Sequence, residues 1–117
     1  MEGHPEFCEL SKKLIFGSEC KDLNKISTIQ TISGTGALNV ILDFIRTFMP
    51  SEIYVPSPTW ATHYQIIQNK GLKFKEYPYF NSKFKNFDCQ GMLDYLNTLP
   101  PKSIILLHAA AHNPTGN

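Results

Sequence analysis

The order of apolar segments along the chain is the feature that most limits the folds open to it. Segments rich in β-branched residues alternate with segments whose apolar residues recur every three or four positions. The first pattern predicts strands and the second predicts amphipathic helices. Strands that alternate with helices form a largely parallel sheet, because each helix carries the chain back to the start of the next strand. We therefore predict an α/β fold, as a partial three-layer α/β/α sandwich of mostly parallel strands.

The same patterns give approximate bounds for each element. We predict helices over residues 5–16, 38–49, 60–70 and 89–99, and strands over residues 24–32, 52–56, 72–77 and 103–109. The first helix carries Phe7, Leu10, Leu14 and Ile15 at helical spacing, and the last is capped by Asp88 with Met92, Leu93 and Leu96 facing inward. Residues 77–87 are predicted to form a loop. About four strands with two unpaired edges indicate part of a larger domain.

The turn Ser33-Gly34-Thr35-Gly36 connects the first predicted strand to the second predicted helix. Ligands of parallel α/β sheets bind at the carboxyl ends of strands, where a helix N-terminus offers free N–H groups and partial positive charge. Glycines let the backbone approach an anion and hydroxyls add donors, so this turn suits a phosphate group. The alternative is an ordinary turn in which Ser33 or Thr35 caps the helix. Neither common nucleotide-binding glycine pattern is completed here.

Trp60 and His63 hold the corresponding place at the start of the next predicted helix. They follow the second predicted strand, so we expect them at the same edge of the sheet as Ser33 and Thr35. The single indole of the chain can stack on a planar ring there, and the imidazole lies on nearly the same helix face. The alternatives are a packing role for the tryptophan and a half-buried surface position for the histidine.

The segment HAAAHNPTG, residues 108–116, almost closes the chain. His108 ends the last predicted strand and Asn113-Pro114 prevents a helix, so His108 and His112 are not a helical zinc pair, and no metal site is predicted. The alanines between them indicate that a bulky group approaches the backbone. Asn113 offers a donor and an acceptor just past the strand. Anion site, indole, imidazole and amide together suit a flat, phosphorylated aromatic cofactor.

Charge and cysteine content exclude several other classes of protein. The net charge is +1 and no basic or acidic block occurs, which argues against nucleic acid and anionic membranes as partners. Cys8, Cys20 and Cys89 are odd in number and form no Cys-x-x-Cys pair, which fits a reducing compartment better than a disulfide framework. No apolar run approaches the roughly 20 residues of a membrane helix. These features predict a cytoplasmic protein.

Three segments carry a resemblance to a known family. SGTGAL (33–38), PSPTWATH (56–63) and LHAAAHNPTG (107–116) look like segments of the aspartate aminotransferase family, among the class-I, fold-type-I pyridoxal-phosphate enzymes. NPTG is typical of aminotransferases broadly, and the longer motif is similar to the aspartate and aromatic subgroup. The resemblance implies pyridoxal 5'-phosphate as cofactor, a homodimer, amino acid and 2-oxo acid substrates, and transfer of the amino group of L-aspartate to 2-oxoglutarate, giving oxaloacetate and L-glutamate.

The resemblance also implies roles for individual residues. Ser33, Gly34 and Thr35 would hold the cofactor phosphate. Trp60 would stack on the pyridine ring and help to position the substrate carboxylate. Asn113 would hydrogen-bond to the phenolic oxygen of the cofactor and touch the α-carboxylate of the substrate.

Two histidines would support this site. His63 would contact the aspartate that pairs with the pyridine nitrogen, and His112 would lie near the pocket without reacting. The family further suggests cis peptide bonds before Pro58 and Pro114.

Other family residues have no counterpart in this chain. The lysine that binds the cofactor, the aspartate at the pyridine nitrogen and the arginines that hold the phosphate and the substrate carboxylates all follow NPTG in the family, while Arg46, Lys70 and Lys73 match none of them. We therefore expect residues 1–117 to be an incomplete cofactor-binding large domain without catalytic activity of its own. The alternatives are a non-catalytic α/β module that binds phosphate or cofactor, an aromatic amino acid aminotransferase fragment, and a self-associating remnant without a ligand.

Overall fold

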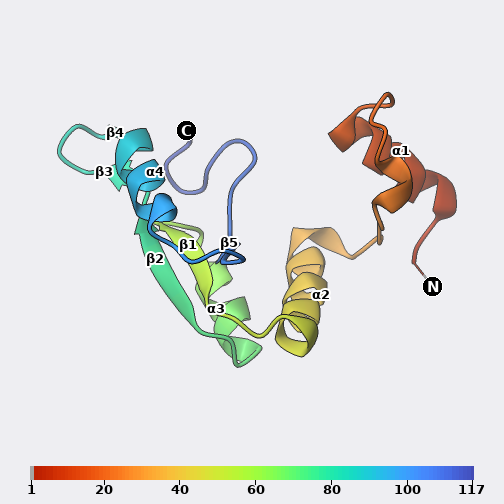
Figure 1. The fold of residues 1–117 in the computed structure, drawn as a ribbon, viewed down its shortest axis with the longest axis horizontal. Helices are drawn as coiled ribbons and strands as arrows, with labels where there is room; N and C mark the ends of the chain where they lie inside the picture. The colour runs from red at the N-terminus through yellow and green to blue at the C-terminus, as the bar shows by residue number, and fades with distance from the viewer. Residues whose placement is uncertain (1) are drawn as a thin grey trace. The chain divides into compact units, whose positions relative to one another are not determined.

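The computed structural model describes residues 2–117. The chain divides into two compact units, Met1–Val40 and Ile41–Asn117. Figure 1 shows the elements as ribbons. In chain order they are α1 (Pro5–Phe16), η1 (Leu23–Lys25), α2 (Ser33–Phe48), β1 (Ile53–Ser57), α3 (Ala61–Asn69), β2 (Phe74–Pro78), β3 (Phe80–Asn81), β4 (Asn86–Phe87), α4 (Cys89–Asn97) and β5 (Ile104–Ile105). Over residues 2–117, no helix is both long and apolar enough to span a membrane.

Helix α1, in the first unit, has the predicted bounds. Pro5 opens it, where a missing N–H costs nothing, and Gly17 ends it with φ 82°, a conformation that favours glycine. Its apolar stripe is exposed, since Leu14 is 86% accessible and Ile15 is 74% accessible. Spacing therefore predicted the helix correctly, but burial of the stripe does not occur within the described residues.

The strand predicted over residues 24–32 is wrong. Leu23–Lys25 form the short 3-10 helix η1, and residues 26–32 have no regular secondary structure. The backbone N–H of Gln30 donates to the carbonyl of Glu2 at 2.8 Å, but no ladder forms with any described segment. A strand requires a hydrogen-bonded neighbour, so β-branched composition alone did not produce one.

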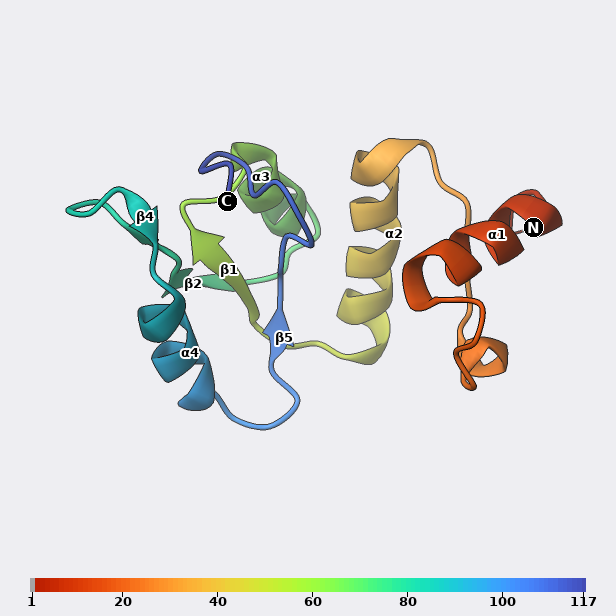
Figure 2. The ribbon, with the colours of Figure 1, turned by 90° about the horizontal axis from the view of Figure 1, so that it is seen from above.

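The second unit is built on a parallel sheet of strand order β2-β1-β5. The central strand β1 pairs with both neighbours, with Ile53 opposite Phe74 on one side and opposite Ile104 on the other. In Figure 2, α3 and α4 lie on opposite sides of this sheet. The predicted α/β fold with helices on both faces of parallel strands is confirmed.

The core of this unit forms around β1, whose residues Ile53 to Pro56 are all buried. Tyr54 faces α4, where its ring meets that of Tyr95 at 6.5 Å, and the neighbouring side chains point to the other face. Other buried apolar side chains come from α2, α3 and β2: Leu42, Ile45, Ile66, Ile67 and Tyr77. A strand that is covered on both faces fixes where its carboxyl end lies, which matters for the residues that follow it.

Two smaller predictions need correction. Asp88 caps α4 as predicted, accepting a hydrogen bond from the N–H of Gly91 at 3.0 Å, but Leu93 is 45% exposed because Tyr95 takes the sheet-facing position. Residues 77–87 are not simply a loop. They finish β2 and form the antiparallel pair β3 and β4, in which Phe80 lies opposite Phe87.

Candidate functional site

Five ring-bearing side chains and one threonine lie in contact beyond the carboxyl ends of the three parallel strands. Tyr79 follows β2, Thr59, Trp60 and His63 follow β1, and His108 and His112 follow β5; we call these six residues the histidine array. The ring of Trp60 meets His63 edge-on at 5.3 Å, and His63 meets His108 edge-on at 5.1 Å. The ring of His112 stacks on His108 at 4.2 Å and on Tyr79 at 3.8 Å. The predicted proximity of Trp60 and His63 on one helix face is thus present.

Hydrogen bonds join the array and fix its proton positions. The backbone N–H of Asn113 donates to Nδ1 of His108 at 3.2 Å, so this nitrogen is an acceptor and the neutral ring carries its proton on Nε2. That Nε2–H then donates to Oγ1 of Thr59 at 3.0 Å. The Thr59 hydroxyl in turn donates to Nδ1 of His63 at 2.9 Å, which leaves His63 with a proton on Nε2. His63 therefore presents a donor at the free edge of its ring.

Burial favours the neutral form of the imidazoles by lowering their pKa values. It is the main cause that lowers the pKa of His63, and charge on His108 or His112 would lower it further. Burial likewise lowers the pKa of His108 and, together with the neighbouring His108, that of His112. Neutral rings are the forms that the hydrogen-bond order requires.

The segment after β5 places a buried residue next to an exposed one. His112 is 2% exposed, its Nδ1 lies 2.9 Å from Oγ1 of Thr115, and its Nε2 has no hydrogen-bond partner among the described residues. The side chain of Asn113 is exposed and makes no hydrogen bond within residues 2–117. The peptide bonds before Pro58 and Pro114 are cis, as the family resemblance suggested.

Ser33, Gly34 and Thr35 lie in the other unit, at the exposed start of α2. The predicted turn is the first turn of this helix, with Ser33 at φ 61°. The N–H groups of these three residues have no acceptor inside the helix, because the first bond of the helix runs from Gly36 to the carbonyl of Ile32 at 3.1 Å. A Cβ at Gly34 would meet nothing within 4 Å, so packing does not demand glycine there. The geometry leaves this helix start open to an anion.

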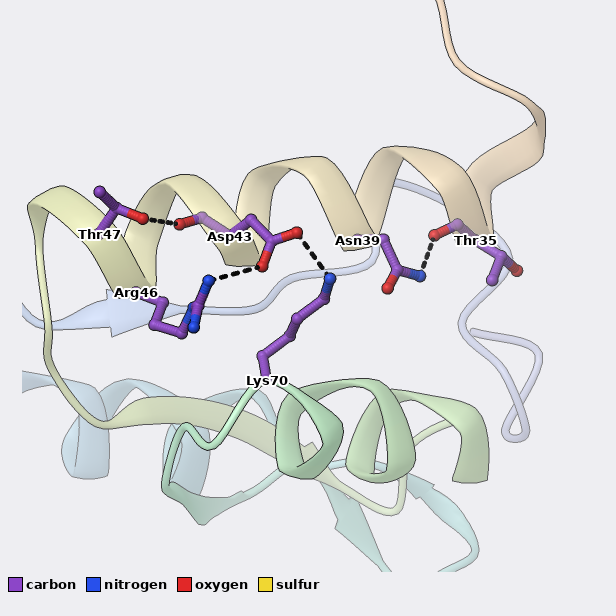
Figure 3. Close-up of polar contacts among 6 residues, drawn as sticks. All are labelled: Thr35, Asn39, Asp43, Arg46, Thr47 and Lys70. Carbon is purple, nitrogen blue, oxygen red and sulfur yellow. Dashed lines mark hydrogen bonds and ion pairs between the residues drawn. The ribbon is translucent and has the colours of Figure 1, made fainter.

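Figure 3 shows how the polar side chains along α2 are used. The carboxylate of Asp43 forms ion pairs with Nζ of Lys70 at 2.6 Å and with Nη2 of Arg46 at 3.5 Å. The hydrogen bond from Lys70 lowers the pKa of this carboxyl group. Nearer the start of the helix, the side chain of Asn39 donates to the carbonyl of Thr35 at 2.9 Å. Arg46 and Lys70 are thus engaged in an ion-pair cluster. Within residues 2–117 no group of acidic, histidine and cysteine side chains is arranged to hold a metal ion.

Sequence reasoning missed three members of the histidine array. Thr59 was not considered, His108 was considered only as a metal ligand, and Tyr79 was assigned to a loop. Their common signal is position, since each lies within two or three residues of the carboxyl end of a strand in the sheet. The order β2-β1-β5, which brings these ends together, is a property of the folded sheet.

Comparison with known proteins shows the family to which the chain belongs. Residues 1–117 match the family Aminotransferase class I and II. The cytoplasmic isozyme 2 of aspartate aminotransferase from Arabidopsis thaliana is 43% identical over 119 residues, covering 99% of this chain and 30% of that protein. The cytoplasmic aspartate aminotransferase of Saccharomyces cerevisiae has a solved structure that superposes with a TM-score of 0.89 at 39% identity, over 97% of this chain and 28% of that one.

The chain is also similar to an aminotransferase that is named for aromatic amino acids. The aromatic-amino-acid aminotransferase of Burkholderia pseudomallei, solved with covalently bound pyridoxal phosphate, superposes with a TM-score of 0.91 at 32% identity, over 97% of this chain and 29% of that one. The chain belongs to the class I and II aminotransferase family, whose members are transaminases. It spans less than a third of the length of these relatives.

Proposed function

We propose that residues 1–117 are the cofactor-holding part of the large domain of an aspartate aminotransferase. In the complete enzyme, the amino group of L-aspartate would pass to 2-oxoglutarate, giving oxaloacetate and L-glutamate. The observation that carries the proposal is the histidine array, which ends in the indole of Trp60 and adjoins Asn113, whose side-chain amide has no hydrogen-bond partner within residues 2–117. Aspartate is favoured over aromatic substrates because the similar curated proteins from plants, animals, fungi and amoebae are named aspartate aminotransferases.

The donor set of this chain fits pyridoxal 5'-phosphate. Three backbone N–H groups and two hydroxyls at the start of α2 suit a phosphate group, and open space at Gly34 lets it approach. Trp60 offers a flat surface for the pyridine ring. The amide of Asn113 can donate to an anionic phenolic oxygen while its carbonyl remains available.

Each residue then has a definite task. Ser33, Gly34 and Thr35 bind the phosphate, and Trp60 holds the plane of the ring. Asn113 binds the phenolic oxygen and the α-carboxylate of the substrate. When bound, the cofactor withdraws electrons so that the α-proton of an amino acid becomes acidic. Holding the ring plane keeps the bond to that proton aligned for cleavage.

The proton positions in the histidine array indicate which group would contact His63 near the pyridine ring of the cofactor. His63 presents Nε2–H, so its partner is an acceptor, and the aspartate carboxylate that the family pairs with the pyridine nitrogen meets this requirement. His112 stays behind the turn and does not react.

Catalysis requires groups that residues 1–117 do not supply. The chain has one arginine, Arg46, and this side chain and Lys70 are engaged by Asp43. We propose that residues 1–117 alone bind cofactor without transaminating, and that the complete enzyme is a homodimer. A cytoplasmic location is supported by relatives named cytoplasmic, although similar mitochondrial proteins exist.

A cofactor titration tests the proposal, because Trp60 is the only tryptophan. We expect saturable quenching of its emission by pyridoxal 5'-phosphate and weaker quenching by pyridoxal, which lacks the phosphate. The double variant Ser33→Ala/Thr35→Ala should weaken the binding of pyridoxal 5'-phosphate and leave that of pyridoxal unchanged. Emission that does not respond to either compound would contradict a cofactor site in this chain.

Two further measurements separate the alternatives. A non-catalytic phosphate module predicts that inorganic phosphate binds as tightly as pyridoxal 5'-phosphate and leaves Trp60 emission unchanged. Incubation of the chain with cofactor, L-aspartate and 2-oxoglutarate should give no oxaloacetate. Turnover by the purified chain would show that the residues needed for catalysis are present within it.

A further inference from the structure

The geometry points to His112 as a positioning residue: we propose that its ring and backbone fix the turn that presents the side chain of Asn113. The inference rests on the proposed cofactor-binding role of Asn113. It concerns only residues of the unit Ile41–Asn117, whose internal contacts are described.

The ring of His112 is held on both faces. Tyr79 stacks on one side at 3.8 Å with an interplanar angle of 13°, and His108 stacks on the other at 4.2 Å and 29°. The residue is 2% exposed. An imidazole between two rings has little freedom to rotate, so its α-carbon is fixed relative to the ends of β2 and β5.

The remaining polar groups of His112 close the turn that follows it. Its N–H donates to the carbonyl of Asn117 at 2.8 Å, and its carbonyl accepts from the N–H of Gly116 at 2.6 Å. Its Nδ1 shares a hydrogen bond of 2.9 Å with the hydroxyl of Thr115, which also accepts from the side chain of Asn117 at 2.9 Å. Residues 113–116 are thus looped around a fixed neighbour.

Asn113, in contrast to the buried His112, has an anchored backbone and an exposed side chain. Its backbone N–H is anchored on Nδ1 of His108 at 3.2 Å, while its exposed side chain makes no hydrogen bond within residues 2–117. The backbone of Asn113 is therefore held by His108 and His112 together, and its amide stays available to a ligand. A buried anchor beside an exposed amide that has no partner in the described part of the chain is the arrangement expected of a residue that positions a binding group.

Stability alone does not account for a histidine at this position. A buried nitrogen without a partner is unfavourable, and Nε2 of His112 is such an atom among the described residues. A phenylalanine would fill the same space between Tyr79 and His108 without that cost. The feature that only histidine supplies here is the hydrogen bond between Nδ1 and the hydroxyl of Thr115, which ties the ring to the turn.

Amide hydrogen exchange on the 117-residue chain tests this role without any ligand. In His112→Phe, which keeps the ring stack, and in Thr115→Val, which replaces the hydroxyl with a methyl group, the N–H groups of Asn113 and Gly116 should exchange about tenfold faster than in the parent chain. Amides of β1 should be unaffected. Unchanged exchange at both positions in both variants would overturn the inference, and His112→Ala adds the loss of the stack where that variant folds.

Titration with pyridoxal 5'-phosphate supplies the functional part of the test. We expect His112→Phe to bind it about tenfold more weakly than the parent chain and no more weakly than Asn113→Ala, while its thermal midpoint is equal or higher. A variant that binds as tightly as the parent would overturn the inference. If the parent chain itself does not bind, the proposed function fails, and the exchange rates still decide whether His112 fixes the turn.

Discussion

The start of α2 in Met1–Val40 and the histidine array in Ile41–Asn117 differ in what holds their side chains. The array is held by the rings stacked on His112 and by hydrogen bonds among Thr59, His63 and His108. Ser33 and Thr35 are exposed, and every residue classed as buried in the described structure lies in the second unit. A parallel sheet with its own core can thus hold aromatic side chains in fixed positions at its edge, whereas an exposed helix start presents backbone N–H groups without such support.

The largest difference between the units should appear when their apolar side chains are truncated. Ile67 is 1% exposed, and Ile67→Ala should lower the free energy of unfolding by about 2–5 kcal/mol because it leaves a cavity under the sheet. Leu14 is 86% exposed, and Leu14→Ala should change the free energy of unfolding by no more than about 0.5 kcal/mol. Urea unfolding followed by circular dichroism measures both. Equal losses would show that the first unit has a comparable core.

Removal of the hydroxyl at the centre of the array should have the next largest effect. Thr59→Val leaves Nδ1 of His63 and Nε2 of His108 without their shared partner, at a cost of about 1–3 kcal/mol. Thr59→Ser keeps the hydroxyl and serves as the matched control, expected to lose less. Urea midpoints of the two variants give the comparison. A valine variant as stable as the serine variant would mean that these hydrogen bonds do not stabilise the array.

Lowering the pH should reduce the stability of the second unit. The pKa values of His63, His108 and His112 lie below the ordinary 6.5, chiefly because burial disfavours the imidazolium form. Below pH 6.5 the unfolded chain binds protons that the folded array does not. The free energy of unfolding therefore decreases as the pH is lowered. The loss levels off below the folded-state pKa values.

Urea midpoints measured from about pH 8 to about pH 5 would show this dependence, a range that spans the ordinary histidine pKa. His63→Asn removes one of the titrating groups and should make the dependence shallower. A midpoint that stays constant across this range, or rises as the pH falls, would contradict neutral histidines in the array.

The ion pair between Asp43 and Lys70 should give the smallest effect. The two side chains are 46% and 20% exposed, and water weakens such pairs. Lys70→Met should lower the urea midpoint slightly, and less at high salt than at low salt, because mobile ions already screen the pair. Lys75→Met, which breaks the exposed pair with Glu52, is the matched control and should lower it even less. A Lys70 effect as large as that of Thr59→Val would place this pair among the main stabilising contacts.

The sequence predicted those features that depend on local periodicity. Helices α1, α3 and α4 and the parallel strands β1 and β2 follow from apolar spacing and from the caps Gly17 and Asp88. Residues 24–32 were predicted wrongly because strand formation depends on a neighbouring segment. Composition cannot supply that neighbour.

The candidate site shows the same limit. Trp60 and Asn113 were singled out from motifs, and their roles stay a prediction. The contacts of Thr59, His108 and Tyr79 were not foreseen, since they arise only when the sheet adopts the order β2-β1-β5. Local patterns thus located the proposed ligand-binding residues, and only the folded sheet revealed the side chains that contact them.

A titration followed by NMR tests most directly whether Trp60 and Asn113 bind the same ligand. Pyridoxal 5'-phosphate is added to the ¹⁵N-labelled 117-residue chain while the indole N–H of Trp60 and the side-chain amide of Asn113 are observed. We predict that both signals shift together with one dissociation constant. Signals that shift with different constants, or that do not shift, would contradict the proposed cofactor site.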